Sequence, residues 1–330
     1  MKKWFSIRDS GWLSLCFVVW TLIASTPLGI VLVLPSMLHW DINPYVMYLA
    51  IGVSELLLIV PLVVYMRLRN IPLKALLGNR VTAVQKVLGT VLGAVMSGAV
   101  MGLNQIMATL FTWWGMPPVD QSFLVPQSWG LALAGLVAVG ITAGVVEEPI
   151  FRGVVLRGMG TVWDRRKAIC LTALAFSLIH MDLVGAPSRF VVGVLLGMLA
   201  WRSGSIVPGV FAHAGYNGAA LLLAFLSTRY FPSFTVLPGL PAMSEDLGAI
   251  VTWLVLSLPF AVLLFAFWGM FRRACRTPGW RSEPAPHATE AYASLPWWLL
   301  GLVVFAMTAL TTVSQWALPW LEKMSGSLGG

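Results

Sequence analysis

The sequence predicts an all-α fold, a polytopic transmembrane helical bundle of about eight to nine helices. Of its 330 residues, 58% are hydrophobic and only 10% are charged, whereas about 25% of the residues in a soluble domain are charged. The mean hydropathy is +0.84, and many apolar runs are long enough to cross about 30 Å of hydrocarbon. The sequence lacks the short alternating segments that build a membrane β-barrel. We therefore expect a single integral membrane domain over residues 1–330.

Nine apolar spans follow one another along the chain, separated by basic or turn-forming residues. Their approximate ranges are 12–38, 44–66, 87–111, 129–157, 168–182, 190–201, 206–226, 247–271 and 295–321. The first span follows a basic start like that of a signal peptide, but it is too long for such a segment, so we expect a retained helix. We expect 129–226, which holds the polar motifs, to be the core, and 247–321 to be a C-terminal helix extension.

The net charge of +8 is distributed as membrane topology requires and not as a nucleic-acid surface. Basic residues cluster in alternate loops, which is the positive-inside pattern. Placing those loops in the cytoplasm puts the N-terminus inside. We therefore expect a multi-pass protein of the bacterial inner membrane that contacts the lipid bilayer and no nucleic acid. The cysteines Cys16, Cys170 and Cys275 have no paired spacing, so neither a disulfide framework nor a cysteine metal site is indicated.

Two adjacent glutamates, Glu147 and Glu148, end an apolar run in the fourth span. Ionisable groups in a membrane-length segment are costly, so they indicate a functional site. Helical neighbours point about 100° apart, and Arg152 follows Glu148 at the i,i+4 spacing of a same-face ion pair. Such a pair would leave Glu147 free to face another group, beside a helix loosened by Pro149. The alternative is a pair of interfacial glutamates neutralised by nearby arginines.

The two segments that follow each carry one histidine. If the fourth and fifth spans form a hairpin that turns near 163–165, Glu147 and His180 lie at similar depth. Phe176 would then pack behind the His180 imidazole. His213 and Asn217 share a helix face, where both can present an N–H to one point. The alternatives are a packing role for His180 and inter-helix hydrogen bonds for His213 and Asn217.

These groups suggest peptide hydrolysis without a covalent intermediate. A carboxylate in apolar surroundings binds a proton more strongly than it does in water, which suits a general base near neutral pH. Glu147, helped by His180, would deprotonate a water and later return the proton to the leaving amine. His213 and Asn217 would stabilise the tetrahedral anion. We favour no cofactor, and the alternative is a zinc ion held by Glu147, His180 and His213.

Three motifs in this order resemble those of the CPBP family, which comprises the CAAX prenyl endopeptidases and the bacteriocin-processing or self-immunity ("Abi") proteins. The motifs are Glu147-Glu148-x-x-x-Arg152, Phe176-x-x-x-His180 and His213-x-x-x-Asn217. The resemblance covers about 129–226 and marks it as a catalytic core. It implies an intramembrane glutamic endopeptidase, of a type formerly classed as a metalloprotease, acting on a membrane-associated protein or peptide that is lipidated or has a C-terminal tail.

The resemblance also implies a role for each motif residue. Glu147 would be the catalytic base with His180 as its partner. His213 and Asn217 would donate to the oxyanion. Glu148, Arg152 and Phe176 would support these catalytic residues.

Two other classes of function stay open at the level of sequence. A non-enzymatic bacteriocin self-immunity protein or membrane scaffold would use the same polar cluster to bind a partner, and would keep its phenotype after Glu147→Gln. A proton- or ion-coupled transporter also uses buried Glu and His as relays. The sequence shows no matching broken-helix segments in two halves, which argues against a transporter.

Overall fold

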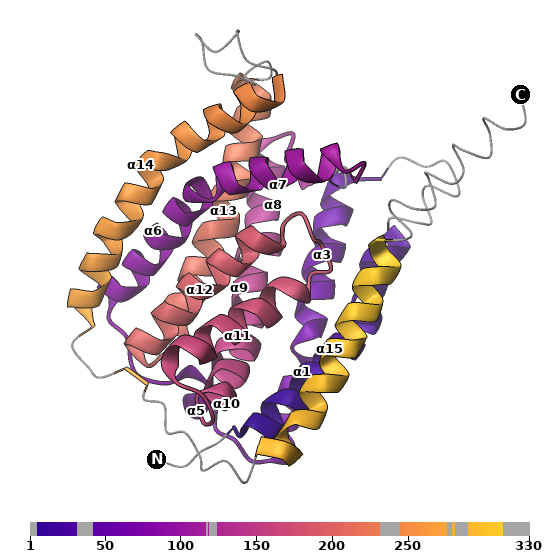
Figure 1. The fold of residues 1–330 in the computed structure, drawn as a ribbon, viewed down its shortest axis with the longest axis vertical. Coiled ribbons are helices and arrows are strands. Elements are labelled where there is room, and N and C mark those ends of the chain that lie inside the picture. Colours follow the sequence, from indigo (N-terminus) through magenta and orange to yellow (C-terminus); the bar gives the residue numbers. More distant parts are fainter. Residues whose placement is uncertain are drawn as a thin grey trace, which may run out of the picture.

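The computed structural model describes residues 5–31, 42–116, 118, 124–231, 245–275, 279–280 and 290–312. Over these ranges the chain forms helices and no β-strand, which confirms the predicted all-α helical bundle (Figure 1). The helices are α1 (Ile7–Ala24), α3 (Pro44–Leu58), α4 (Val60–Leu68), α5 (Leu73–Leu77), α6 (Ala83–Ala99), α7 (Met101–Trp113), α8 (Trp129–Gly135), η2 (Leu136–Ile141), α9 (Thr142–Glu148), η3 (Pro149–Val155), α10 (Leu156–Met159), α11 (Arg165–Leu178), α12 (Ala186–Ser203), α13 (Val207–Tyr230), α14 (Glu245–Ala274) and α15 (Glu290–Thr312).

Among the described residues, six helical stretches are long and apolar enough to cross a membrane, so the chain is an integral membrane protein. They are Ile7–Val31, Pro44–Leu68, Ala83–Trp113, Trp129–Met159, Val207–Tyr230 and Asp246–Ala274. The expected fifth and sixth spans form helices α11 and α12 but are not among these six. The expected ninth span contributes the apolar stretch Leu299–Leu310. Residues 32–38 of the first expected span and 313–321 of the ninth lie outside the described residues.

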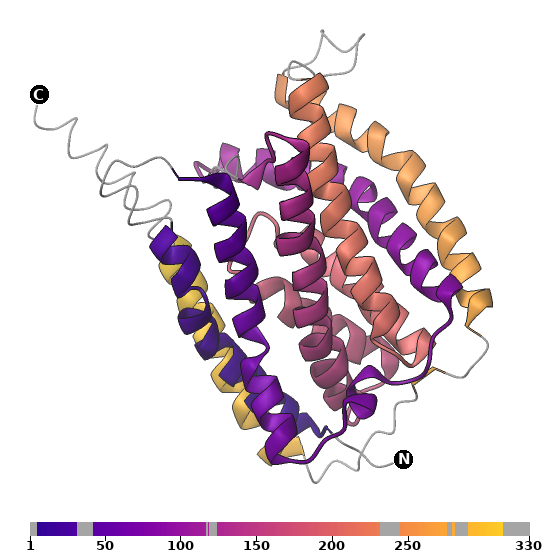
Figure 2. The same ribbon diagram turned by 180° about the vertical axis from the view of Figure 1, so that it is seen from behind.

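The helices that carry the polar motifs lie in the middle of the bundle. Figures 1 and 2 show α14 along one edge and α1 with α15 along the opposite edge, with α9, α11, α12 and α13 between them. Helix α13 packs closely against α6, because Gly93 has no side chain: a Cβ added there would collide with the backbone oxygen of Ala212. The outer helices therefore shield the motif helices on both sides.

The fourth span is a continuous helical rod with two π-helical segments. Segments η2 and η3 flank α9, and Pro149 stands at the start of η3. π-Helical turns are rare and often occur at functional sites, because the wider turn changes the direction of side chains and frees carbonyl groups. This finding agrees with the expectation that Pro149 perturbs the helix beside the glutamates. Glu147 and Glu148 consequently occupy the last turn before the second π segment.

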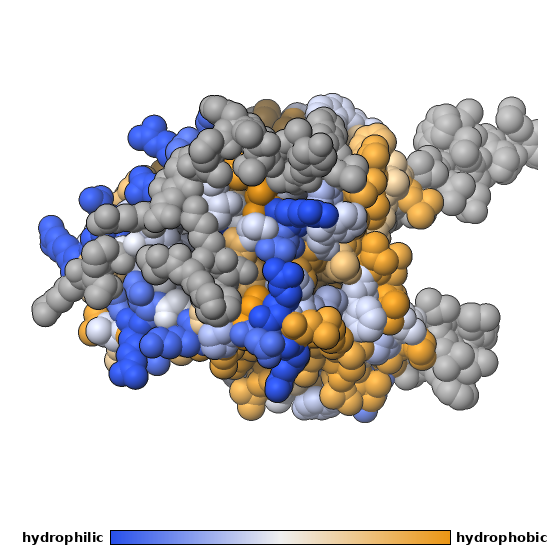
Figure 3. Space-filling model, turned by 90° about the horizontal axis from the view of Figure 1, so that it is seen from below, coloured by the Kyte–Doolittle hydropathy of each residue, from blue (hydrophilic) through white to orange (hydrophobic). Residues whose placement is uncertain are grey.

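Basic side chains tie the loops together at one end of the bundle. Arg157 of α10 donates hydrogen bonds to the carbonyl oxygens of Ala75 and Leu76. Arg202, at the end of α12, donates to the carbonyl oxygen of Arg272 at 3.0 Å. Figure 3 views this end and shows hydrophilic residues gathered over it. The basic loops of the core and of α14 therefore lie on the same side of the membrane.

Candidate functional site

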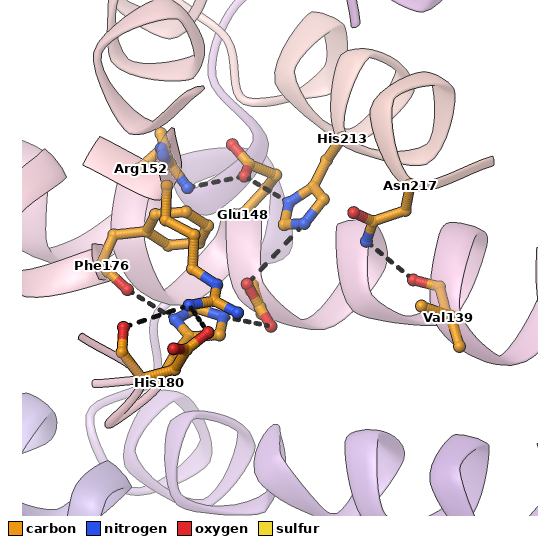
Figure 4. A network of polar contacts seen from close by, with 10 residues as sticks. Val139, Glu148, Arg152, Phe176, His180, His213 and Asn217 are labelled. Atoms are coloured by element: carbon orange, nitrogen blue, oxygen red, sulfur yellow. Dashed lines mark hydrogen bonds and ion pairs between the residues drawn. The ribbon is translucent and has the colours of Figure 1, made fainter. Parts of the chain in front are cut away.

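A buried ion pair between Glu148 and Arg152 anchors the site. Arg152 Nη1 lies 2.7 Å from Glu148 Oε1, and both side chains are 0% exposed. The second nitrogen, Nη2, donates to the carbonyl oxygen of Gly193 on α12 at 3.2 Å. Glu148 Oε1 also accepts a hydrogen bond from His213 Nδ1 on α13, over 3.0 Å (Figure 4). The predicted i,i+4 pair is present, and it joins the fourth span to α12 and α13.

The Phe176 ring forms an aromatic wall next to this pair. Its centroid lies 5.1 Å from the ring centroid of His180 and 5.8 Å from that of His213, and both contacts are edge-on. The Arg152 guanidinium carbon lies 4.5 Å from the centre of the same ring, which is within the range of a cation–π interaction. Phe176 therefore packs against both histidines, and its predicted contact with His180 is present.

The Glu147 carboxylate lies between the two imidazoles. Its Oε1 is 4.0 Å from His180 Nε2, and its Oε2 is 3.9 Å from His213 Nε2. Glu147 Oε2 is enclosed and has no hydrogen-bond partner among the described residues. These separations are too long for direct hydrogen bonds, but a single water can bridge each of them. The predicted meeting of Glu147, His180 and His213 is thus present, at separations longer than a direct hydrogen bond.

Both histidines are oriented by what their Nδ1 atoms contact. His180 Nδ1 lies 2.7 Å from the carbonyl oxygen of Phe176, and a carbonyl can only accept, so Nδ1 carries the hydrogen. His213 Nδ1 donates in the same way to Glu148 Oε1, which already accepts from Arg152. In the neutral rings, each Nε2 therefore presents a lone pair towards Glu147. His213 gains an Nε2–H donor only when the ring is protonated on both nitrogens.

Helix α11 and the turn after it place His180. Asp164 caps the start of α11 by accepting hydrogen bonds from the backbone N–H groups of Arg166 and Lys167, and these bonds lower the pKa of its exposed carboxyl. Directly after His180, Met181 has a φ of 52°, a conformation uncommon for residues other than glycine. The chain thus turns away from α11 at the histidine.

Asn217 lies on α13 one turn beyond His213, as predicted. Its Nδ2 donates to the carbonyl oxygen of Val139 at 2.9 Å, and Val139 belongs to η2. Figure 4 shows the amide directed towards Val139 and away from His180. The structure therefore does not show the Asn217 and His213 donors converging on one point. One N–H of Asn217 is engaged by η2, and the second remains for another acceptor.

Glu55, on α3, is a neighbour of the site that the sequence analysis did not identify. Helix α3 packs against α9, and the charge of the Glu55 carboxylate acts on Glu147. Its Oε2 is enclosed and has no hydrogen-bond partner in the described part of the chain. Glu55 is the sole ionisable carboxylic or basic residue between Pro44 and Met66. The rule that marks intramembrane ionisable residues as functional could have found it.

A second ion pair lies at the exposed side of the site. Arg189 Nη1 is 2.8 Å from Asp182 Oδ2, and these side chains are 26% and 33% exposed. The Arg189 charge acts on both Glu147 and His180. His180 is itself 29% exposed, whereas His213 is only 5% exposed. The site is therefore closed at His213 and open at His180.

The zinc alternative fits these residues poorly. Ligand atoms at about 2.0–2.1 Å from a tetrahedral zinc are about 3.3 Å apart, which is shorter than the 3.9 and 4.0 Å from Glu147 to His213 and His180. Within the described ranges, no group of three His, Cys, Asp or Glu side chains is arranged to hold a metal ion. The Nδ1 contacts of both histidines do resemble those of zinc-binding histidines. The separations nevertheless suit a bridging water better than a metal.

The fold and the site define a class: a helical integral membrane protein with a buried glutamate between two histidines. Residues 128–219 match the family of type II CAAX prenyl endopeptidases described as Rce1-like. This match confirms the resemblance to the CPBP and CAAX protease family over nearly the same segment as the motifs, and it indicates a protease. No curated protein and no solved structure matches the chain.

Proposed function

We propose that the protein is an intramembrane endopeptidase that hydrolyses a peptide bond with a water activated by Glu147. The observation that carries this proposal is the position of the Glu147 carboxylate, 4.0 Å from His180 Nε2 and 3.9 Å from His213 Nε2. Each ring is held by its Nδ1 contact, so both Nε2 atoms are kept facing the carboxylate. A carboxylate that faces two oriented imidazoles without bonding directly to either supports hydrolysis over simple helix packing.

The proposed nucleophile is a water between Glu147 and His180. It would donate one hydrogen to Glu147 Oε1 and the other to the lone pair of His180 Nε2. The oxygen lone pairs would then face outward, towards the side where His180 is exposed. Proton transfer to a positioned carboxylate speeds such an attack by about 10²–10⁴-fold. Glu147 would hold the proton during the attack and return it to the nitrogen of the leaving amine.

His213 and Asn217 are the proposed donors to the oxyanion. Because His213 Nδ1 donates to Glu148, the ring can donate from Nε2 only as an imidazolium. Asn217 would contribute the N–H that Val139 does not engage. Donors fixed in advance in a site with little water stabilise a developing anion more than water does. The ion pair with Arg152 keeps Glu148 in place through the reaction.

The proposed substrate is a membrane-associated protein or peptide that is lipidated or carries a C-terminal tail. The match to CAAX prenyl endopeptidases supports a prenylated substrate among these. The basic end of the bundle supports a cytoplasmic N-terminus, which in a bacterium places the protein in the inner membrane. We propose that no metal takes part, and elemental analysis of active protein tests this. Stoichiometric zinc that is lost together with activity would contradict it.

The experiment that tests the function compares cells that express wild type, Glu147→Gln or the matched control Asp246→Asn. Asp246 is exposed at the start of α14, where it accepts a hydrogen bond from Trp113. Mass spectrometry of protein termini in the membrane fraction should show uncleaved termini in Glu147→Gln cells that are absent from wild-type cells and from the Asp246→Asn control. An unchanged set of termini, with the phenotype retained, would instead support the non-enzymatic immunity or scaffold alternative.

A further inference from the structure

The Arg189 guanidinium has donors that the protein does not use. Arg189 Nη1 donates to Asp182 Oδ2 at 2.8 Å and to the Asp182 carbonyl oxygen at 3.5 Å. Nη2 and Nε have no partner among the described residues. A guanidinium can bind a carboxylate through two parallel N–H groups. The contact with Asp182 uses only one nitrogen, so this capacity remains available.

Arg189 differs in this respect from the other guanidinium of the site. Arg152 is 0% exposed and is bound by Glu148, by the Gly193 carbonyl oxygen and by the Phe176 ring. Arg189 is 26% exposed. Arg152 is therefore a fixed part of the protein interior, whereas Arg189 can be reached by another molecule.

Arg189 also stands where a substrate must arrive. The site is closed on the side of His213 and open on the side of His180, which is 29% exposed. Arg189 is paired with Asp182, which follows His180 by two residues, so the guanidinium lies at this open side. The unused N–H groups of Arg189 are therefore close to the side from which a chain would reach Glu147.

We propose that Arg189 binds a carboxylate of the substrate close to the scissile bond and so helps select the substrate. This proposal rests on the proposed function, since it assigns a specificity residue to that site. The carboxylate is either the α-carboxylate at the end of the substrate chain or an Asp or Glu side chain. Asp182 holds the guanidinium at the rim, because its Oδ1 is fixed by the backbone N–H of Gly185 at 3.2 Å.

Binding to inactive protein tests the proposal without a need for cleavage. The protein is Glu147→Gln in detergent, and the probes are three pools of N-terminally fluorescent random hexapeptides. One pool has a free C-terminal carboxylate and no Asp or Glu, the second is C-terminally amidated with Asp or Glu, and the third is amidated without them. At least one carboxylate-bearing pool should bind about 10- to 100-fold more tightly than the third. Which pool does so identifies the source of the carboxylate.

Substitutions in the Glu147→Gln background then test whether the preference for carboxylate-bearing peptides depends on Arg189. Arg189→Gln should abolish it, and Arg189→Lys should retain part of it, since lysine keeps the charge but not the fork. The matched control is Arg229→Gln, about 18 Å along α13 from Asn217, at an exposed position, and it should retain the full preference.

Three results would overturn the proposal: equal affinity for all three pools, no binding of any pool, or a preference that survives Arg189→Gln. A carboxylate preference that depends on Arg189, in a protein whose wild type cleaves nothing, would instead refute the proposed function and leave the binding role of Arg189 intact.

Discussion

Loss of the Arg152 side chain should destabilise the protein strongly, because it leaves Glu148 buried without its charge partner. The perturbation is Arg152→Met, which keeps an unbranched apolar chain in place of the arginine methylenes and removes the guanidinium. It deletes the 2.7 Å bond to Glu148, the 3.2 Å bond to the Gly193 carbonyl oxygen and the contact with the Phe176 ring. Breaking a buried pair from one side costs about 3–5 kcal/mol.

The double replacement Glu148→Leu with Arg152→Met separates pairing from packing. Removing both charges replaces the pair by apolar groups of similar volume, which is often close to neutral for stability. The double variant should therefore be more stable than Arg152→Met alone. His213 loses its Nδ1 acceptor in the double variant, so activity should be absent even where the fold is retained.

These free energies of unfolding are measured by titrating the detergent-solubilised protein with SDS and following the loss of the helical circular dichroism signal. Arg229→Met is the matched control, because Arg229 is exposed and the same change there should alter stability by less than about 0.5 kcal/mol. Two results would contradict a buried ion pair of this strength. One is a loss of less than about 1 kcal/mol in Arg152→Met. The other is a loss in the double variant equal to the sum of the losses in Arg152→Met and in Glu148→Leu made alone.

Substitutions at three further positions have defined outcomes. Gly209→Ala places a Cβ 2.7 Å from Glu148 Oε2, so thermal unfolding should show a loss of about 1–3 kcal/mol; an unchanged midpoint would mean that Glu148 can move aside. Glu55→Leu removes an enclosed carboxylate oxygen without a partner and should raise the free energy of unfolding by about 1–3 kcal/mol. Glu55→Gln should give a smaller gain. Lower stability in both variants would show that Glu55 has a stabilising role. Asn217→Ala should lower kcat about 100-fold with little change in KM, and a loss confined to KM would exclude its proposed contact with the oxyanion.

The parts of the site that helix geometry dictates could be predicted from the sequence. Glu148 and Arg152 are one turn apart on the same rod, so their pairing follows from the 3.6-residue period. Glu147 and His180 meet because the fourth and fifth helical segments form the predicted hairpin, in which equal distances from the turn give equal depth. Phe176 lies against His180 because the two residues, like Glu148 and Arg152, are four positions apart.

The residues that the sequence analysis missed depend on tertiary structure. The contact of Asn217 with Val139 is made to the π-helical segment η2. A single π-helical turn gives no periodic signal in a uniformly apolar run of sequence. Glu55 belongs to no motif, and its position next to Glu147 follows from how α3 packs on the fourth span. Arg189 is held beside the site by its contact with Asp182, in the turn that follows Met181. Each of these placements comes from packing between elements and not from spacing within one.

The most direct test of glutamate-activated hydrolysis is the single-turnover cleavage rate of purified protein in proteoliposomes. The substrate is the protein whose uncleaved form accumulates in Glu147→Gln cells, and the enzyme is wild type or Glu147→Gln, with equal unfolding midpoints. Because Glu147 is proposed as the base, its amide should reduce the rate by about 10²–10⁴-fold. A Glu147→Gln rate within tenfold of wild type would contradict the mechanism.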